Sequence, residues 1–250
     1  MPISVIKGSW DYCTKNIWFF LFVLILLFIL EFFSGNLNAS FLTSPIVFFI
    51  LLGYGLQVTK DVIDGGNRLP KIMPRKLISY LVMGGIVFLF YVTIQIILLA
   101  FVSSFLNFPM FEMEDLFLKY HETINLFINH DVVSFTIFVI SGFVIVYVTS
   151  FFMELALARL ADGGNLKEAF NFARIKHAID VIGWKRYTLG YSKIIFCVII
   201  LTFVHSHLIS PYGFINVTCG VILDMLTFVI EYRGIGIVYK VYTDAKRGVN

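Results

Sequence analysis

Four polar side chains interrupt long apolar runs of this sequence. Asp224 and Gln95 lie near the middle of their runs, and Glu154 and Glu231 lie closer to the ends of theirs. If these runs cross a membrane, an ionisable group within them costs several kcal/mol unless it is paired, so such groups are candidates for function. We therefore take Asp224, Gln95, Glu154 and Glu231 as a candidate intramembrane polar site.

The sequence offers these side chains different partners. Arg159 and Arg233 closely follow Glu154 and Glu231, and we expect ion pairs between them. We expect Asp224 to face the interior of a helix bundle, since an aspartate facing lipid is poorly tolerated. Two interpretations stay open for it: an interhelical hydrogen bond, or a proton- or cation-coupled site.

Other residue types that carry chemistry are not arranged for it. His205 and His207, and His121 and His130 with their acidic neighbours, form short pairs, whereas a zinc site needs about four converging ligands. The sequence contains no nucleophile elbow and no HExxH motif, and such motifs mark common hydrolases. We therefore predict no catalytic residue, no metal site and no cofactor.

A tetrapeptide, Asp-Gly-Gly-Asn, occurs twice, at 64–67 and at 162–165. Each copy follows an apolar run and precedes a basic stretch, which indicates an internal repeat. A glycine in the left-handed conformation satisfies the last carbonyl groups of a helix without a Cβ clash. We therefore predict that Gly65, Gly66, Gly163 and Gly164 are helix caps. The alternative is an anion-binding nest of backbone N–H groups.

The composition is that of an integral membrane protein. Hydrophobic residues make up 59% of the chain and charged residues 14%, whereas a soluble domain has roughly 45–50% apolar and about 25% charged residues. The net charge is only +3, and the basic residues form short clusters next to apolar runs. This pattern indicates membrane orientation rather than nucleic-acid binding, so the lipid bilayer is the expected partner.

Six apolar runs are long enough to cross a membrane as helices. Crossing a hydrocarbon core of roughly 30 Å takes about 20 residues. The third, fourth and sixth runs exceed this minimum, so we expect them to tilt or to extend past the membrane boundary. The runs cover residues 17–33, 41–63, 77–106, 132–161, 188–209 and 214–242.

Lysine and arginine residues gather on one side of these runs. They follow the second, fourth and sixth runs, whereas the three opposite loops hold only Lys119. Positive residues near short loops stay in the cytoplasm, so we predict that both termini are cytoplasmic. The predicted fold is all-α, a polytopic membrane protein with six transmembrane helices as three hairpins and with interfacial amphipathic helices. It forms a single domain over 1–250, with hairpin units at about 1–67, 68–165 and 166–250.

The basic stretch after the second tetrapeptide predicts an amphipathic helix at the cytoplasmic surface. Asn165 and Glu168 have the spacing of a capping box, and Gly183 is placed to end the helix. Each basic residue near an anionic leaflet contributes on the order of 1 kcal/mol. The alternative role for these charges is orientation of the chain during insertion. The candidate anionic-lipid contacts are Arg174, Lys176, Lys185 and Arg186.

A second amphipathic helix is predicted in the long outer loop, at 107–131. Apolar side chains recur there on one face at helical spacing, and acidic residues lie elsewhere. Because the segment is acidic, unlike the usual basic membrane-surface helix, apolar burial must hold it at the outer leaflet.

Two stretches, KDVIDGGNRLP at 60–70 and LALARLADGGNLKEAF at 155–170, resemble a known family. It is the multi-pass membrane family catalogued as domain of unknown function 4013, found chiefly in archaea and some bacteria, and the similarity extends over most of the chain. Gly-Gly-Asn stands here where an acid-rich segment is common in that family. The resemblance implies the fold and a prokaryotic plasma membrane, and it implies no established activity or catalytic residues.

Three kinds of function fit these observations. The preferred one is a non-enzymatic membrane protein of a prokaryotic cell envelope, acting in transport or in lipid-linked envelope physiology. The first alternative is a scaffold or accessory subunit of a membrane complex, with a protein partner or a second copy of the chain. The second is a membrane enzyme that acts on lipid headgroups.

Overall fold

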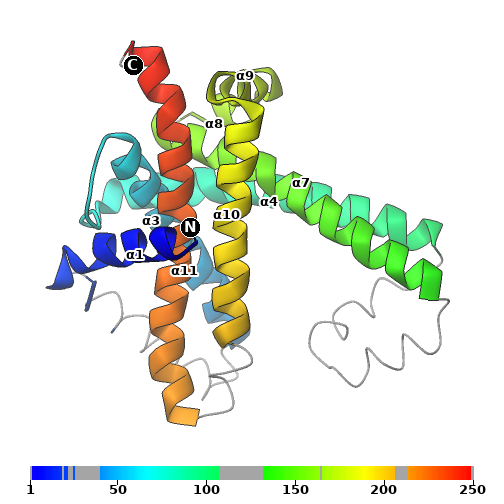
Figure 1. Cartoon of the computed structure of the whole chain (residues 1–250), viewed down its shortest axis with the longest axis horizontal. Coiled ribbons are helices and arrows are strands. Elements are labelled where there is room, and N and C mark those ends of the chain that lie inside the picture. The colour runs from blue at the N-terminus through cyan, green and yellow to red at the C-terminus, as the bar shows by residue number, and fades with distance from the viewer. Residues whose placement is uncertain are drawn as a thin grey trace. The chain divides into compact units, whose positions relative to one another are not determined.

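The computed structural model shows an all-helical protein. It describes residues 2–18, 20, 21, 25, 40–106, 132–163, 165–205 and 213–248. These residues form eight α-helices and no strand, so the predicted all-α class is confirmed. The helices are α1 (Pro2–Thr14), α3 (Ser40–Ile63), α4 (Pro74–Phe105), α7 (Val132–Gly163), α8 (Leu166–Ala169), α9 (Phe172–Ile182), α10 (Trp184–Phe203) and α11 (Gly213–Arg247) (Figure 1).

Three helices in the described part of the chain are long and apolar enough to cross a membrane, judged by length and composition. They are α4, α7 and α10. Helices α3 and α11 occupy the second and sixth predicted spans but are not among these three. The first predicted span, 17–33, and the outer-loop helix, 107–131, lie largely or wholly outside the described residues. A membrane protein is therefore supported, and six spans in three hairpins remain a prediction.

The chain divides into two compact units. The larger consists of Met1–Val87 and Glu154–Asn250, and the smaller of Phe88–Met153. In the smaller unit, the side-chain amide of Gln95 donates to the Val146 carbonyl at 3.4 Å and lies 3.3 Å from Ser150 Oγ. Gln95 therefore joins α4 to α7 within the smaller unit.

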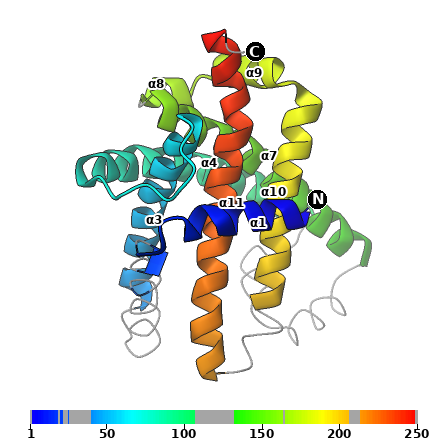
Figure 2. The same ribbon diagram turned by 60° about the vertical axis from the view of Figure 1, so that its left-hand side comes forward.

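Helix α11 is central to the larger unit. It packs against α1, α3, α9 and α10, and both views show α10 alongside it and α1 running across it (Figures 1 and 2). Two glycines allow close approach: a Cβ on Gly234 would lie 2.7 Å from Ile194 of α10, and one on Gly236 would lie 3.1 Å from the Thr59 carbonyl of α3. Small residues serve this purpose where membrane helices pack. The core between α10 and α11 comprises Ile194, Cys197, Leu201, Leu226 and Ile230.

Side chains of α3 hold the segment that connects it to α4. Gln57 forms two hydrogen bonds with Met73: its amide donates to the carbonyl at 3.2 Å, and its side-chain oxygen accepts from the N–H at 3.1 Å. The Tyr54 hydroxyl donates to the Pro70 carbonyl at 3.0 Å. Pro74 begins α4, a position where the missing N–H of proline has no cost. Helix α3 thus positions the loop that follows it.

The single helix predicted after the second tetrapeptide is two helices. The side chain of Asn165 caps α8, accepting from the N–H two residues later at 2.9 Å. Asn171 then caps α9, accepting from the Arg174 N–H at 3.1 Å. Asparagine side chains compete for backbone N–H groups, which favours a new helix start over continuation. Gly183, with a φ of 89°, ends α9.

Candidate functional site

The first tetrapeptide ends α3 with a Schellman motif. The Gly66 N–H donates to the Asp61 carbonyl at 2.7 Å, and the Gly65 N–H donates to the Val62 carbonyl at 3.1 Å. Gly65 has a φ of 94°, the left-handed conformation that this motif needs. Both glycine N–H groups are occupied by carbonyls, so the loop lacks the free donors that an anion nest would require.

The second tetrapeptide has a different backbone. Helix α7 continues through Gly163, which is its last residue. In the described part of the chain, the glycines with positive φ are Gly65, Gly183 and Gly248. Gly164 lies outside the described residues. A left-handed cap at Gly163 is therefore wrong, because the helix still includes that residue, and a cap at Gly164 stays a prediction.

Lys60 joins the two tetrapeptides. Its Nζ lies 3.3 Å from Asp64 Oδ1 in the first copy and 3.3 Å from Asp162 Oδ1 in the second. It also donates to the Asp162 carbonyl at 3.4 Å. Lys60 stands one helical turn before Asp64, whereas the residue one turn before Asp162 is the fully buried Ala158. The two copies thus share one cation, which the first copy supplies.

A buried arginine ties the end of α7 to α8 and α9. The Arg159 side chain is only 6% exposed. Its Nε donates to the Glu168 carbonyl at 3.3 Å, and its Nη1 donates to the Arg174 carbonyl at 3.0 Å. The Glu168 carboxylate accepts from Arg159 with one oxygen and from Arg174 with the other. This arginine therefore stabilises the corner between three helices.

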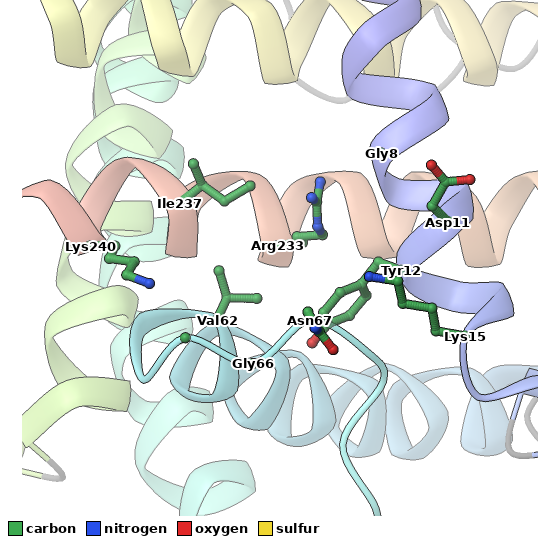
Figure 3. A pocket seen from close by; sticks show the side chains of 11 residues that line it. Gly8, Asp11, Tyr12, Lys15, Val62, Gly66, Asn67, Arg233, Ile237 and Lys240 are labelled. Carbon is green, nitrogen blue, oxygen red and sulfur yellow. The ribbon is translucent and has the colours of Figure 1, made fainter.

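A polar pocket lies between α1, the loop after α3, and α11. Its volume is about 300 Å³, and Lys15, Arg233, Lys240 and Asp11 are the charged residues that line it. Figure 3 shows Arg233 and Lys240 along α11, across from the segment that carries Gly66. Positive side chains thus outnumber acidic ones at this pocket. The other lining residues are Gly8, Tyr12, Val62, Gly65, Gly66, Asn67 and Ile237.

A chain of contacts fixes one wall of this pocket. The Arg233 guanidinium lies over the Tyr12 ring, 5.5 Å from its centroid, and Nη1 lies 3.5 Å from Ser9 Oγ. The Tyr12 hydroxyl donates to Asp61 Oδ2 at 3.1 Å. Burial, and then the negative charge of Asp61, raise the pKa of Tyr12 well above its ordinary value. The phenol therefore stays neutral, and α1, α3 and α11 are joined beside the pocket.

Glu154 and Glu231 bind each other rather than arginines. A hydrogen bond joins their side chains, and Glu154 is 6% exposed. The expected ion pairs with Arg159 and Arg233 are wrong, because the first guanidinium binds the α7–α8–α9 corner and the second lies over Tyr12. Two carboxyl groups form a hydrogen bond only when at least one of them is protonated, so this contact requires that the two groups are not both ionised.

A family model matches residues 37–210 of the chain, and its description is a protein of unknown function, DUF4013. The chain belongs to the DUF4013 family. The sequence-based resemblance is thereby confirmed. The matched region of this DUF4013 protein includes both tetrapeptides, whereas α1 and α11, which carry or adjoin the basic side chains of the pocket, lie outside it. No curated protein and no solved structure matches the chain.

Asp224 of this DUF4013 protein pairs with a histidine at the end of α10. Its Oδ1 lies 3.2 Å from His205 Nδ1, and among the described residues its side chain is 54% exposed. The position of Asp224 in the interior of a helix bundle stays a prediction, and its described partner is His205. The neighbouring His207 lies outside the described residues.

The predicted lipid contacts of the DUF4013 protein lie at its surface. Helix α9 buries one face, formed by Ile175, Ala178, Ile179 and Ile182. Its charged face is exposed, and Phe172 on the same helix is 50% exposed. Arg174 also binds Glu168, so it is less available than the other three. The exposed basic residues are Arg174, Lys176, Lys185 and Arg186.

The sequence did not single out Lys15, Arg233 and Lys240 of the DUF4013 protein as neighbours. They lie at opposite ends of the chain, and only the packing of α1 and α11 brings them together. The sequence held one indication that Lys240 deserved notice: it precedes an aspartate by four residues, as Lys60 does.

Proposed function

We propose that this protein is a multi-pass plasma-membrane protein of a prokaryote that binds a phosphate-bearing lipid headgroup in its polar pocket. Such binding would serve transport or lipid-linked envelope physiology. The observation that carries the proposal is the convergence of Lys15, Arg233 and Lys240 on one pocket of about 300 Å³. The charge asymmetry of the loops supports a cytoplasmic position for this pocket and for both termini.

The lining residues suit phosphate. Arginine binds phosphate oxygens through a planar fork of donors, and lysine binds them as a point charge. Tyr12 and Ser9 hold the Arg233 guanidinium in place, which lowers the entropy cost of binding. Lys240 Nζ would lie 3.5 Å from a Cβ on Gly65, so it stands over the first tetrapeptide. The volume is at the small end of ligand pockets, roughly 300–1,000 Å³, and fits a headgroup.

The surroundings of the pocket favour a lipid over a free solute. Trp10 on α1 is 43% exposed, and Trp18 just beyond that helix is 82% exposed. Tryptophan is enriched where membrane meets water. Helix α1 crosses α11 instead of running along it (Figure 2), as a helix lying in the membrane surface would cross a spanning helix. The pocket is then level with the headgroups.

Binding of three probes to the purified full-length protein in detergent tests the proposal. The probes are dihexanoyl phosphatidic acid, dihexanoyl phosphatidylcholine and inorganic phosphate, each titrated by calorimetry. We expect phosphatidic acid to bind most tightly. Lys240→Gln should weaken that binding about tenfold, because a hydrogen bond to a charged group contributes about 1.5 kcal/mol.

The matched control is Lys246→Gln, which removes an exposed lysine from the same helix outside the pocket and should leave binding unchanged. Equal affinity of Lys240→Gln and the parent for phosphatidic acid contradicts the pocket. If inorganic phosphate binds as tightly as phosphatidic acid, the ligand of the pocket is a soluble anion instead of a lipid. Equal binding of phosphatidylcholine means that negative charge is not recognised.

A further inference from the structure

The polar pocket has two positive ends. Arg233 and Lys240 both belong to α11 and line the pocket, two turns of the helix apart, which is a rise of about 10 Å along the helix axis. Figure 3 shows Lys240 at one end of the pocket and Arg233 toward the other, with Lys15 on the same side as Arg233. The basic side chains therefore form two groups.

Contacts with different elements hold the two ends apart. The Arg233 guanidinium lies over the Tyr12 ring of α1, 5.5 Å from its centroid, and its Nη1 lies 3.5 Å from Ser9 Oγ of the same helix. Lys240 stands over the end of α3 instead, where its Nζ would lie 3.5 Å from a Cβ on Gly65. A hydrogen bond to a phosphate oxygen extends only about 3 Å. One phosphate group therefore contacts one end or the other.

Apolar side chains lie between the two ends. Val62 and Ile237 line the pocket and are placed between Lys240 and Arg233 (Figure 3). These side chains offer no hydrogen bond to a phosphate oxygen, and burying a charge against them is costly. The lining therefore suits a ligand that has an anionic group at each end and carbon between them.

We propose that the pocket binds a lipid with two phosphodiester groups joined by a short carbon linker, as in cardiolipin, where the linker is glycerol. This inference rests on the proposed function and specifies its ligand. One phosphodiester contacts Lys240, and the other contacts Arg233 and Lys15. The linker then lies against Val62 and Ile237.

The charge of the lining agrees with such a ligand. Three basic residues and one acidic residue, Asp11, line the pocket, which gives a net charge of +2 at neutral pH. Each phosphodiester carries one negative charge, so two of them balance the lining. In a diphosphate a single oxygen joins the two phosphorus atoms, and this bridge is too short to span the two ends.

Calorimetric titration of the purified full-length protein in detergent tests the inference. Tetrahexanoyl cardiolipin supplies two phosphodiesters, dihexanoyl phosphatidylglycerol supplies one with the same glycerol, and farnesyl diphosphate supplies two phosphorus atoms without a linker. We expect cardiolipin to bind at least about tenfold more tightly than either of the others, because its second phosphodiester gains hydrogen bonds to charged groups. Affinity for cardiolipin that only equals that for either of the others overturns the inference.

Two lysine variants separate the second phosphodiester from the additional acyl chains of cardiolipin. Cardiolipin should bind about tenfold more weakly to both Lys240→Gln and Lys15→Gln. Phosphatidylglycerol should depend on Lys240, as phosphatidic acid does, and should bind Lys15→Gln as it binds the parent. Lys15 is exposed and Lys240 partly exposed, so both variants should melt near the parent. The control is Lys7→Gln, which removes an exposed lysine of α1 outside the pocket and should change neither affinity.

The outcomes distinguish this inference from the proposed function. If Lys15→Gln binds cardiolipin as tightly as the parent does, the second end is not used and the inference is wrong, whereas binding of phosphatidic acid that depends on Lys240 still supports the proposed function. If both lysine variants weaken phosphatidylglycerol equally, one phosphate contacts both lysines, and the inference is again wrong. If no anionic lipid responds to Lys240→Gln, the inference and the proposed function both fail.

Discussion

The same substitution, glycine to alanine, should have opposite effects on stability in the two tetrapeptides. Gly65 has a φ of 94°, where an L-residue is disfavoured by about 1–2 kcal/mol. At Gly66 the obstacle is steric, because a Cβ would lie 1.8 Å from Asp61 Oδ2. The carboxylate must then move and give up the hydrogen bond from Tyr12, at a cost of about 1–3 kcal/mol.

The equivalent glycine of the second copy should tolerate the change. A Cβ on Gly163 would meet only Glu168 Cγ, at 3.9 Å, which is an ordinary contact. Gly163 is helical, and alanine is favoured over glycine within a helix by roughly 0.5–1 kcal/mol. Gly163→Ala should therefore leave the free energy of unfolding unchanged or raise it slightly.

Scanning fluorimetry of the purified variants in one detergent measures the difference. For a chain of this size, 1 kcal/mol shifts the melting temperature by about 2–4 °C. Gly65→Ala should then melt about 2–8 °C below the parent, and Gly66→Ala should be lowered at least as much. An unchanged melting temperature for Gly65→Ala, or an equal loss for Gly163→Ala, refutes the assignment of the cap.

A double-mutant cycle tests the mechanism proposed for Gly66. If Gly66→Ala acts by displacing Asp61 from Tyr12, then Tyr12→Phe already removes the hydrogen bond that the alanine would break, and with it part of the stability that Gly66→Ala loses. The drop in melting temperature caused by Gly66→Ala should accordingly be smaller in the Tyr12→Phe background. An equal drop in both backgrounds means that the alanine acts through the backbone alone.

Three further predictions concern other parts of the larger unit. Arg159→Met should lower the free energy of unfolding by about 3–5 kcal/mol in denaturant titrations, because it leaves buried polar partners unpaired. Arg186→Met, at the surface, should change the free energy of unfolding little. Equal losses in the two variants would contradict a stabilising role for Arg159 at the corner of α7, α8 and α9. Burial raises the pKa of the Cys13 thiol to about 12, so its thiolate is scarce at neutral pH, and maleimide should label it far more slowly in the native than in the denatured protein; equal rates would contradict the burial. Asn67→Cys, in a background without native cysteines, should escape membrane-impermeant maleimide in intact cells, and labelling from outside would overturn the cytoplasmic placement of the first tetrapeptide.

Sequence reasoning succeeded where structure depends on close neighbours along the chain. The end of α3 follows from glycine in the first tetrapeptide, and the end of α9 follows from Gly183. Both are decided by the backbone freedom of one residue. The division between α8 and α9 was missed because Asn171 lies within an otherwise amphipathic pattern, where its side chain competes with the helix for N–H groups.

The partners of the buried charges could not be predicted in this way. For Glu154 and Glu231 the sequence offered nearby arginines, yet the hydrogen bond joins α7 to α11. Asp224 likewise meets His205 of a preceding segment. Each pairing is set by which helices pack together, and neither periodicity nor charge spacing contains that information. The pocket was missed for the same reason, since its basic side chains come from both ends of the chain.

Because the two tetrapeptides share Lys60, either of their aspartates can be lost with little effect, whereas the lysine cannot. With either Asp64 or Asp162 neutralised, Lys60 still has a carboxylate at 3.3 Å, so each change alone is buffered by the other. Loss of the lysine itself removes this cation from both carboxylates at once, and Asp64 then keeps only Arg247, whose Nη2 lies 3.6 Å from Asp64 Oδ1. Substitutions at these three positions are thus epistatic: a mutation in one half of the chain decides whether a later one in the other half is silent or harmful.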